Sequence, residues 1–165
     1  MYMKPYAELT RLGRLRRMLQ LASIALEYYG VRESQIHFLR QAGNTLFRVQ
    51  TDYLQGLPEA GDLFEAGQYL LRVHQPGDQE VDAIELELAW LAAMRREASL
   101  PVQEPVAARD GRLLLSVEVP GVPGQRQCSL LRWIKGRSVK NHFTPEHLRA
   151  QGRLAAPGGA VQAAV

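Results

Sequence analysis

One long helical pattern, enclosed between short strand-like runs, constrains the fold of this 165-residue chain most strongly. Pro76-Gly77-Asp78 opens a segment that runs to about Ala98, and further prolines follow at positions 101 and 105. Proline is disfavoured inside a helix, so this punctuation bounds the segment at both ends. The apolar residues between recur at spacings of three and four, which predicts one amphipathic helix: Val81, Ile84, Leu88 and Leu91.

Strand patterns lie on both sides of this helix. Before it, apolar runs cover residues 36–39, 46–49 and 69–74, and the small residues between the first two predict a hairpin. After it, Asp110-Gly111 stands between the runs 106–109 and 112–117, which predicts a second hairpin, and a further strand follows at 128–134. The run at 128–134 is expected to be a connecting strand, and the expected fold is therefore α+β, with a five-stranded antiparallel sheet and one long helix after the third strand.

Helices are also expected near both ends of the chain. Leucines at spacings of three and four between Tyr6 and Tyr29 predict N-terminal helices that end near Gly30. Thr144-Pro145-Glu146 has the residues of a helix start. We therefore expect an N-terminal helical segment at 1–30, the sheet domain at 31–137, the start of a second lobe at 138–156, and a separate tail at 157–165.

Composition excludes several classes of protein. Apolar residues make up 46% and charged residues 22%, as in globular domains. The lone Cys128 has no disulfide partner and no metal-ligand neighbours, so we expect a reducing cytoplasm and no zinc. The apolar stretch at 19–26 is too short to cross a membrane. Five basic residues crowd the first seventeen positions: Lys4, Arg11, Arg14, Arg16 and Arg17.

This basic cluster has two interpretations. It can be the solvated face of a helix, or it can contact nucleic acid or an anionic membrane. We favour the solvated face, because no aromatic residues interleave with the arginines as in a nucleic-acid contact.

Two features can bind a polyphosphate. The tip Ala42-Gly43-Asn44-Thr45 can close over phosphates, because glycine allows the backbone to approach closely, and Arg72 on the next strand can reach phosphate oxygens. Each also has an ordinary reading, since Gly-Asn is common in turns and arginine is common at surfaces.

Glu87 adds a third observation. At 100° per residue it falls in the apolar half of the predicted helix, together with Trp90 and Met94, whereas Glu85 falls outside that half. A carboxylate on a packing face requires a cation, and Arg72 is the candidate. Alternatively, Glu87 reaches solvent at the edge of the face or pairs with Arg95 or Arg96.

Four segments, in this order, resemble the aminoglycoside phosphotransferase and choline kinase superfamily, with the homoserine-kinase-like branch nearest. They span most of the chain: Gln41-Ala42-Gly43-Asn44-Thr45-Leu46-Phe47-Arg48-Val49, Tyr69-Leu70-Leu71-Arg72-Val73, Glu85-Leu86-Glu87-Leu88-Ala89-Trp90-Leu91 and Leu130-Leu131-Arg132-Trp133-Ile134-Lys135-Gly136-Arg137. The resemblance implies a kinase-like N-terminal lobe that binds ATP and belongs to an enzyme phosphorylating a small-molecule alcohol.

The resemblance also implies roles for individual residues. Gly43, Asn44 and Thr45 would lie in the phosphate-covering loop, Arg72 would take the place of the phosphate-binding strand lysine, and Glu87 would be its partner. Leu131, Arg132 and Trp133 would form the hinge, whose backbone recognises adenine. The base would lie between Val49, Leu70 and Leu131, although ordinary core packing explains these three equally well.

The chain departs from the family in its last residues. The second lobe would supply a catalytic aspartate and the ligands for magnesium, and no His-Gly-Asp-type loop occurs here. The sequence instead changes to glycine, alanine and proline after Ala156. We therefore expect no catalytic or metal-binding residue, a shortened C-terminal helix, and a truncated lobe that is inactive alone and self-associates through its hinge side. The alternative is a non-enzymatic nucleotide-binding or regulatory module that pairs with another chain.

Overall fold

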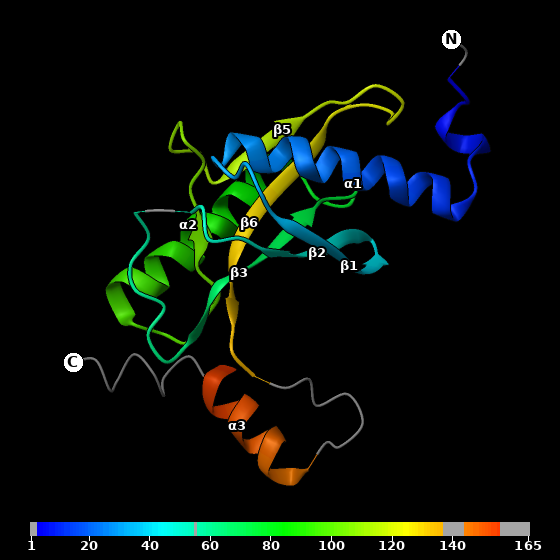
Figure 1. Ribbon diagram of the computed structural model, residues 1–165. Helices are drawn as coiled ribbons and strands as arrows, with labels where there is room; N and C mark the ends of the chain where they lie inside the picture. The colour runs from blue at the N-terminus through cyan, green and yellow to red at the C-terminus, as the bar shows by residue number, and fades with distance from the viewer. Residues whose placement is uncertain (1–2, 55, 137–143, 156–165) are drawn as a thin grey trace.

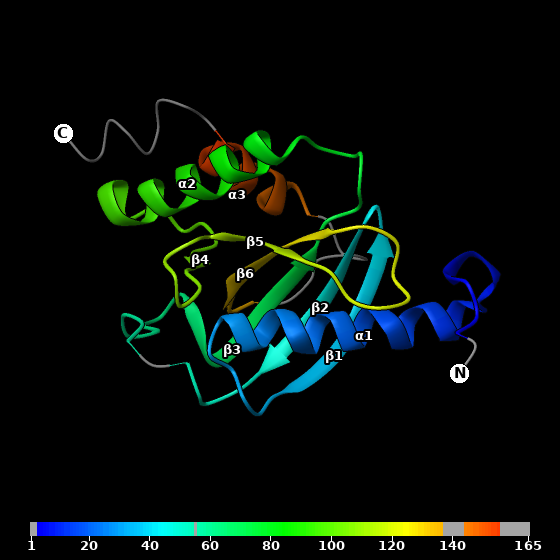
Figure 2. The ribbon, with the colours of Figure 1, turned by 90° about the horizontal axis from the view of Figure 1, so that it is seen from above.

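The computed structural model describes residues 3–54, 56–136 and 144–155. One helix lies on each side of a central antiparallel sheet, and a third helix lies beyond the end of the last strand (Figures 1 and 2). The elements in chain order are a 3₁₀ turn at Tyr6–Glu8, α1 Arg11–Tyr28, β1 Gln35–Ala42, β2 Asn44–Gln50, β3 Phe64–Val73, α2 Val81–Ala98, β4 Pro105–Val106, β5 Leu114–Val117, β6 Arg126–Ile134 and α3 Pro145–Ala155.

The sheet has six strands in the described residues, one more than we expected, and its order is β1-β2-β3-β6-β4 with β5 also on β6. Asp110-Gly111 does form a turn, closed by a hydrogen bond of 2.9 Å from the Gly111 N–H to the Ala108 carbonyl. The strands on either side of it do not pair with each other as predicted. β5 pairs with the first half of β6 and β4 with the second half, so two short strands share one edge of β6.

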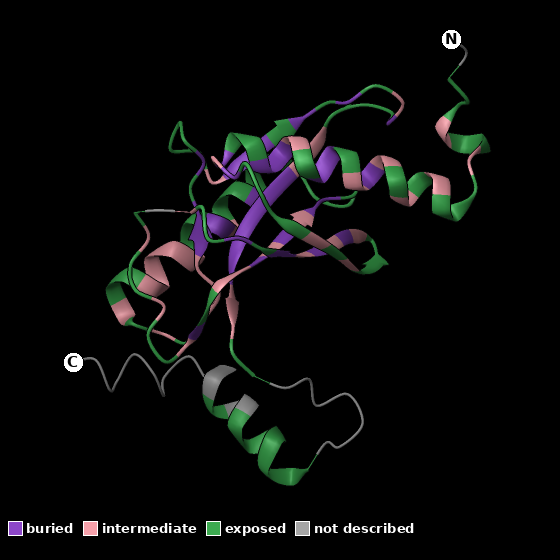
Figure 3. Ribbon diagram, in the orientation of Figure 1, coloured by how far each residue is buried: buried purple, intermediate pink, exposed green. Residues whose placement is uncertain are grey.

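Helix α1 covers one face of the sheet, and the larger hydrophobic core lies between them. Thr10 caps its first turn, because the Thr10 hydroxyl accepts a hydrogen bond of 3.1 Å from the Gly13 N–H. The helix ends before Gly30, which has a positive φ of 86°, as the sequence predicts. Leu21 and Leu26 of α1 are fully buried against Phe47, Leu71 and other side chains of the sheet (Figure 3).

Helix α2 covers the opposite face with a narrower stripe than its periodicity indicates. Ile84 and Leu88 are its buried residues, packed with Leu114 and Leu131. Trp90, which we placed on the packing face, is 65% exposed. The reason is that α2 rests on the short β4 and β5, so only one row of its side chains reaches the sheet.

A β-bulge in β1 determines which side chains face each side of the hairpin. Phe38 pairs with Phe47 and Arg40 pairs with Leu46, so Leu39 is an extra residue without an opposite partner. Beyond the bulge, Gln41 pairs with Thr45 and therefore faces the α1 side together with it. Simple alternation along β1 would have placed Gln41 on the other face.

Helix α3 begins as predicted, with the Thr144 hydroxyl accepting a hydrogen bond of 3.3 Å from the His147 N–H. The boundary expected between residues 137 and 138 and the tail expected at 157–165 lie outside the described residues. None of the helices in the described part of the chain is long and apolar enough to cross a membrane.

Candidate functional site

A cavity of about 480 Å³ opens on the α2 side of the sheet. Successive strand residues point to opposite faces, and Leu46 and Leu70 point to this one. The lining residues come from β1, β2, β3, β6 and the segment before β4: Leu39, Arg40, Leu46, Leu70, Gln103, Trp133 and Ile134. This is the size and largely apolar character of a small-molecule site.

Arg72 lies on the same face as Leu70, two residues further along β3, and forms an ion pair with Glu87 of α2. The guanidinium donates a hydrogen bond of 2.9 Å to the Glu87 carboxylate, and the two side chains are 18% and 35% exposed. The predicted pair is therefore confirmed. Arg96 instead pairs with Glu97, and Arg95 donates to the Leu100 carbonyl.

Two further residues extend this pair, and the sequence analysis missed both. The Arg72 Nε–H points to the Ser129 hydroxyl at 3.4 Å, and Ser129 is also 3.1 Å from Nε2 of the buried His74. His74 follows Arg72 by two residues in the same extended segment, so strand alternation could have placed it on this face. Burial, reinforced by the positive charge of Arg72 and opposed by Glu87, lowers the pKa of His74 to about 4.

Gly43 forms a one-residue turn between β1 and β2. Its φ is 72°, in the left-handed region that favours glycine. The next residue fixes the turn to the loop after β3, because the Asn44 side-chain oxygen accepts a hydrogen bond of 3.0 Å from the Gln75 N–H. An oxygen of the Asp78 carboxylate lies 3.0 Å from where a Cβ on Gly43 would stand, so a larger residue would meet it. A hydrogen bond thus joins the hairpin tip to the segment that leads into α2.

The side chains of three predicted nucleotide-binding residues do not reach this cavity. Thr45 and Val49 point to the α1 side of the sheet and are buried there, with Val49 fully enclosed in the core. Arg132 points the same way, forms an ion pair of 2.8 Å with Glu104, and lies 4.4 Å from the centre of the Phe64 ring. All three alternate with residues that face the cavity, so the side chains of Thr45, Val49 and Arg132 point away from it.

The remaining predicted contacts belong to the cavity side. Trp133 lines the cavity, and the Arg48 guanidinium lies 4.7 Å above its ring while donating to the Gln68 side chain. Leu131 faces the same side but is fully buried against Ile84 and Leu88 of α2, so its side chain does not line the cavity. Of the base-sandwiching residues we predicted, Leu70 alone lines the open cavity.

This arrangement suits a ligand that is flat and apolar at one end and anionic at the other. Leucine side chains and an indole ring offer apolar walls, and a guanidinium held by a carboxylate offers a fixed positive fork. Within residues 3–54, 56–136 and 144–155, no group of three or more His, Cys, Asp or Glu residues could hold a metal ion.

Comparisons with known proteins agree with this geometry. The model of the phosphotransferase enzyme family matches residues 35–165. The structure of a microcompartment-associated aminopropanol kinase is similar, with a TM-score of 0.60 and 28% sequence identity over 82% of this chain. The match covers 38% of that kinase, so this chain spans well under half of its length. A search of curated proteins finds no match. The fold is thus kinase-like, and the chain belongs to the phosphotransferase enzyme family.

Proposed function

We propose that this chain is the nucleotide-binding lobe of an ATP-dependent small-molecule phosphotransferase. One observation carries the proposal: the Arg72–Glu87 ion pair stands on the same face of the sheet as the cavity lined by Leu70 and Trp133. A kinase needs a pocket for the base and, next to it, a fixed cation for the phosphates. Family membership supports the same conclusion independently.

The residues fit adenosine triphosphate in a specific order. Leu46, Leu70 and Trp133 would contact the adenine ring, which is flat and largely apolar. Arg72 is paired with Leu46 across the β2–β3 ladder and would receive the phosphates next to the base. Gly43 and Asn44 follow at the end of the hairpin, where backbone N–H groups would complete the phosphate site.

The polar network behind Arg72 would keep its guanidinium directed at the phosphates. Glu87 holds one end of the fork and Ser129 the Nε–H, so rotation of the side chain would break two contacts. A neutral His74 adds no competing positive charge beside it at neutral pH. Magnesium, when bound with the nucleotide, would neutralise charge on the phosphates.

For the acceptor we propose a small alcohol, and an amino alcohol first. The support is the likeness to a protein described as an aminopropanol kinase. Transfer itself belongs in this proposal to the whole protein, whereas nucleotide binding is assigned to the described residues.

The test is calorimetric titration of the chain with ADP. We expect Arg72→Gln to weaken ADP binding at least about tenfold, because one charge-assisted phosphate contact contributes roughly 1.5–3 kcal/mol. Glu87→Gln should weaken it less, since the guanidinium remains. The matched control is Arg96→Gln, which removes an exposed arginine of α2 paired with its neighbour Glu97. Equal ADP affinity in wild type and Arg72→Gln would refute the proposed function.

A further inference from the structure

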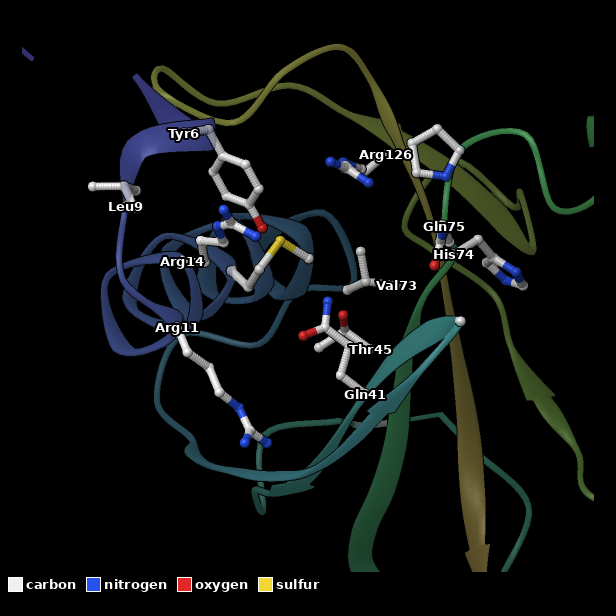
Figure 4. A pocket seen from close by; sticks show the side chains of 13 residues that line it. Tyr6, Leu9, Arg11, Arg14, Gln41, Thr45, Val73, His74, Gln75 and Arg126 are labelled. Carbon is white, nitrogen blue, oxygen red and sulfur yellow. The ribbon is translucent and has the colours of Figure 1, made fainter. Parts of the chain in front are cut away.

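A second and larger cavity, of about 600 Å³, lies on the other face of the sheet, beneath the N-terminal turn (Figure 4). Its walls come from the 3₁₀ turn, α1, the β1–β2 hairpin, the end of β3 and the start of β6. Thr45 and Val73 form part of its floor, and these residues face away from Leu46 and Arg72 in the same strands. The cavity beside Leu70 and this cavity therefore lie on opposite faces of the sheet, and Gly43 at the hairpin tip, where the sheet ends, also lines this second cavity.

The charges around this cavity are of one sign. Arg11 and Arg14 of α1 and Arg126 of β6 line it, and none of its lining residues is acidic. Within the described residues, none of these arginines takes part in an ion pair. Asp78, whose carboxylate lies beside Gly43, is not among the lining residues.

Two of the guanidinium groups point into the cavity. Figure 4 shows Arg14 and Arg126 directed from opposite walls toward the same space, whereas Arg11 points away from it. Arg14 is held in place by the Ala7 carbonyl at 2.8 Å and by the Tyr6 ring, whose centre lies 5.7 Å from the guanidinium carbon. The Nε–H of Arg126 is buried and has no hydrogen-bond partner among the described residues. The protein encloses this Nε–H, so an anion in the cavity would meet Arg126 at its terminal amino groups. Two guanidinium charges that face one space without a counter-charge repel each other, so an anion between them would be stabilising.

Neutral polar groups face the same space. Gln41 reaches it because of the bulge in β1. The Thr45 side chain lies beside Gln41 and has a relative exposure of 3%. His74 also lines the cavity, but Figure 4 shows its ring directed away from it, and the ring Nε2 lies 3.1 Å from the Ser129 hydroxyl. Leu9, Met18 and Val73 add apolar walls.

We propose that this cavity binds a small phosphorylated organic molecule, with the phosphate between Arg14 and Arg126 and the organic part against the apolar wall. Arginine forks match the oxygens of phosphate, and amide and hydroxyl groups supply further hydrogen bonds. The volume is that of a small-molecule site rather than of a surface for a polymer. The basic N-terminal helix thus directs one of its arginines into a recess, in addition to the solvated face that the sequence indicates.

The test is calorimetric titration of the full chain with phenyl phosphate at low ionic strength. We expect Arg14→Gln and Arg126→Gln each to weaken binding about tenfold, the effect of losing one charge-assisted contact. Arg16→Gln is the matched control, because Arg16 is an exposed arginine of the same helix that does not line the cavity. Thr45→Val tests the floor without a change of charge, and we expect a severalfold loss. Thermal unfolding of each variant shows that it is folded.

The nucleotide site serves as an internal comparison. Arg72→Gln should leave phenyl phosphate binding unchanged, and Arg126→Gln should leave ADP binding unchanged. The inference is overturned if wild-type protein does not bind phenyl phosphate, if Arg16→Gln weakens binding as much as Arg126→Gln, or if Arg72→Gln is the variant that loses it. Each of these results is independent of whether ADP binds on the other face.

Discussion

Arg72 of β3 and Glu87 of α2 are joined by a hydrogen bond of 2.9 Å, which ties the central strand to the helix that covers it. Their side chains are 18% and 35% exposed, so the pair is neither fully buried nor solvated. Its contribution to stability should therefore fall between that of surface pairs and that of buried pairs.

A double-mutant cycle with Arg72→Gln and Glu87→Gln measures that contribution. We expect a coupling energy of about 1 kcal/mol in denaturant unfolding. The exposed pair Arg96–Glu97, with side chains 73% and 69% exposed, should give less than about 0.5 kcal/mol in the same cycle. A coupling energy for Arg72 and Glu87 no larger than that of the surface pair would show that the two side chains are not held together in solution.

Acid should destabilise the protein through His74. Its pKa is lowered from 6.5 to about 4 in the folded state, chiefly by burial and then by the charge of Arg72. The stability that a neutral His74 provides is complete above pH 6.5 and is lost as the pH falls toward 4, by up to about 3 kcal/mol. Unfolding free energies of wild type and His74→Asn, measured from pH 7 to 4, should converge at low pH. His37→Asn, at an exposed position of β1, should keep the wild-type slope.

Asn44 should protect one backbone amide. The Gln75 N–H donates to the Asn44 side chain at 3.0 Å, so Asn44→Ala removes its acceptor. We expect faster hydrogen exchange at Gln75 and a loss of about 1 kcal/mol. The neighbouring His74 N–H, which donates to the Gln127 carbonyl at 2.8 Å, should exchange as before. Asn44→Asp keeps an acceptor and should restore protection at Gln75; failure to do so would argue against this contact.

Arg132 should act on stability and not on nucleotide binding. Its side chain is 7% exposed and pairs with Glu104 at 2.8 Å on the face away from the proposed nucleotide cavity. Glu104→Gln should cost about 2–3 kcal/mol of unfolding free energy, because it leaves a nearly buried guanidinium without its counter-charge. Glu85→Gln, at an exposed position, should change little. ADP affinity of the folded Glu104→Gln protein should match wild type, and a large loss would place Arg132 in the site after all.

Helix α2 offers a test of which of its side chains pack. Leu88 is fully buried and Trp90 is 65% exposed. Leu88→Ala should cost about 2–5 kcal/mol, whereas Trp90→Gln should stay within about 0.5 kcal/mol of wild type. If Trp90→Gln were strongly destabilising, the tryptophan would have to pack in solution as the helical periodicity indicates.

Much of this architecture follows from local sequence. Periodicity located α1 and α2, and the β1–β2 hairpin formed where Gly43 permits a positive φ. The sequence named Arg72 as a candidate partner of Glu87, because a carboxylate toward the packing side of a helix requires a cation, and the structure decides between this pair and the alternatives with Arg95 or Arg96. These features depend on neighbouring residues in the chain or on one strong electrostatic requirement.

The facing of individual strand residues was less predictable, because it depends on pairing register. Val49 was assigned to the adenine base, yet its side chain points to the α1 side while its neighbours point to the cavity. The side chain of Arg132, a residue assigned to the nucleotide through the hinge backbone, points the same way. Trp90 was placed in the core because periodicity gives the direction of a side chain and not the extent of the surface opposite it. The cavity under the N-terminal turn depends on how α1 docks, which no local pattern encodes.

The bulge at Leu39 also makes β1 tolerant of a change in length. Were Leu39 deleted, Phe38 would still oppose Phe47, and Arg40 would still oppose Leu46, in an uninterrupted ladder. Every later side chain of the strand would keep its side of the sheet, and one aliphatic wall of the cavity beside Trp133 would be gone. Position 39 is thus a place where shortening the chain by one residue would enlarge a single pocket and leave the rest of the molecule in register.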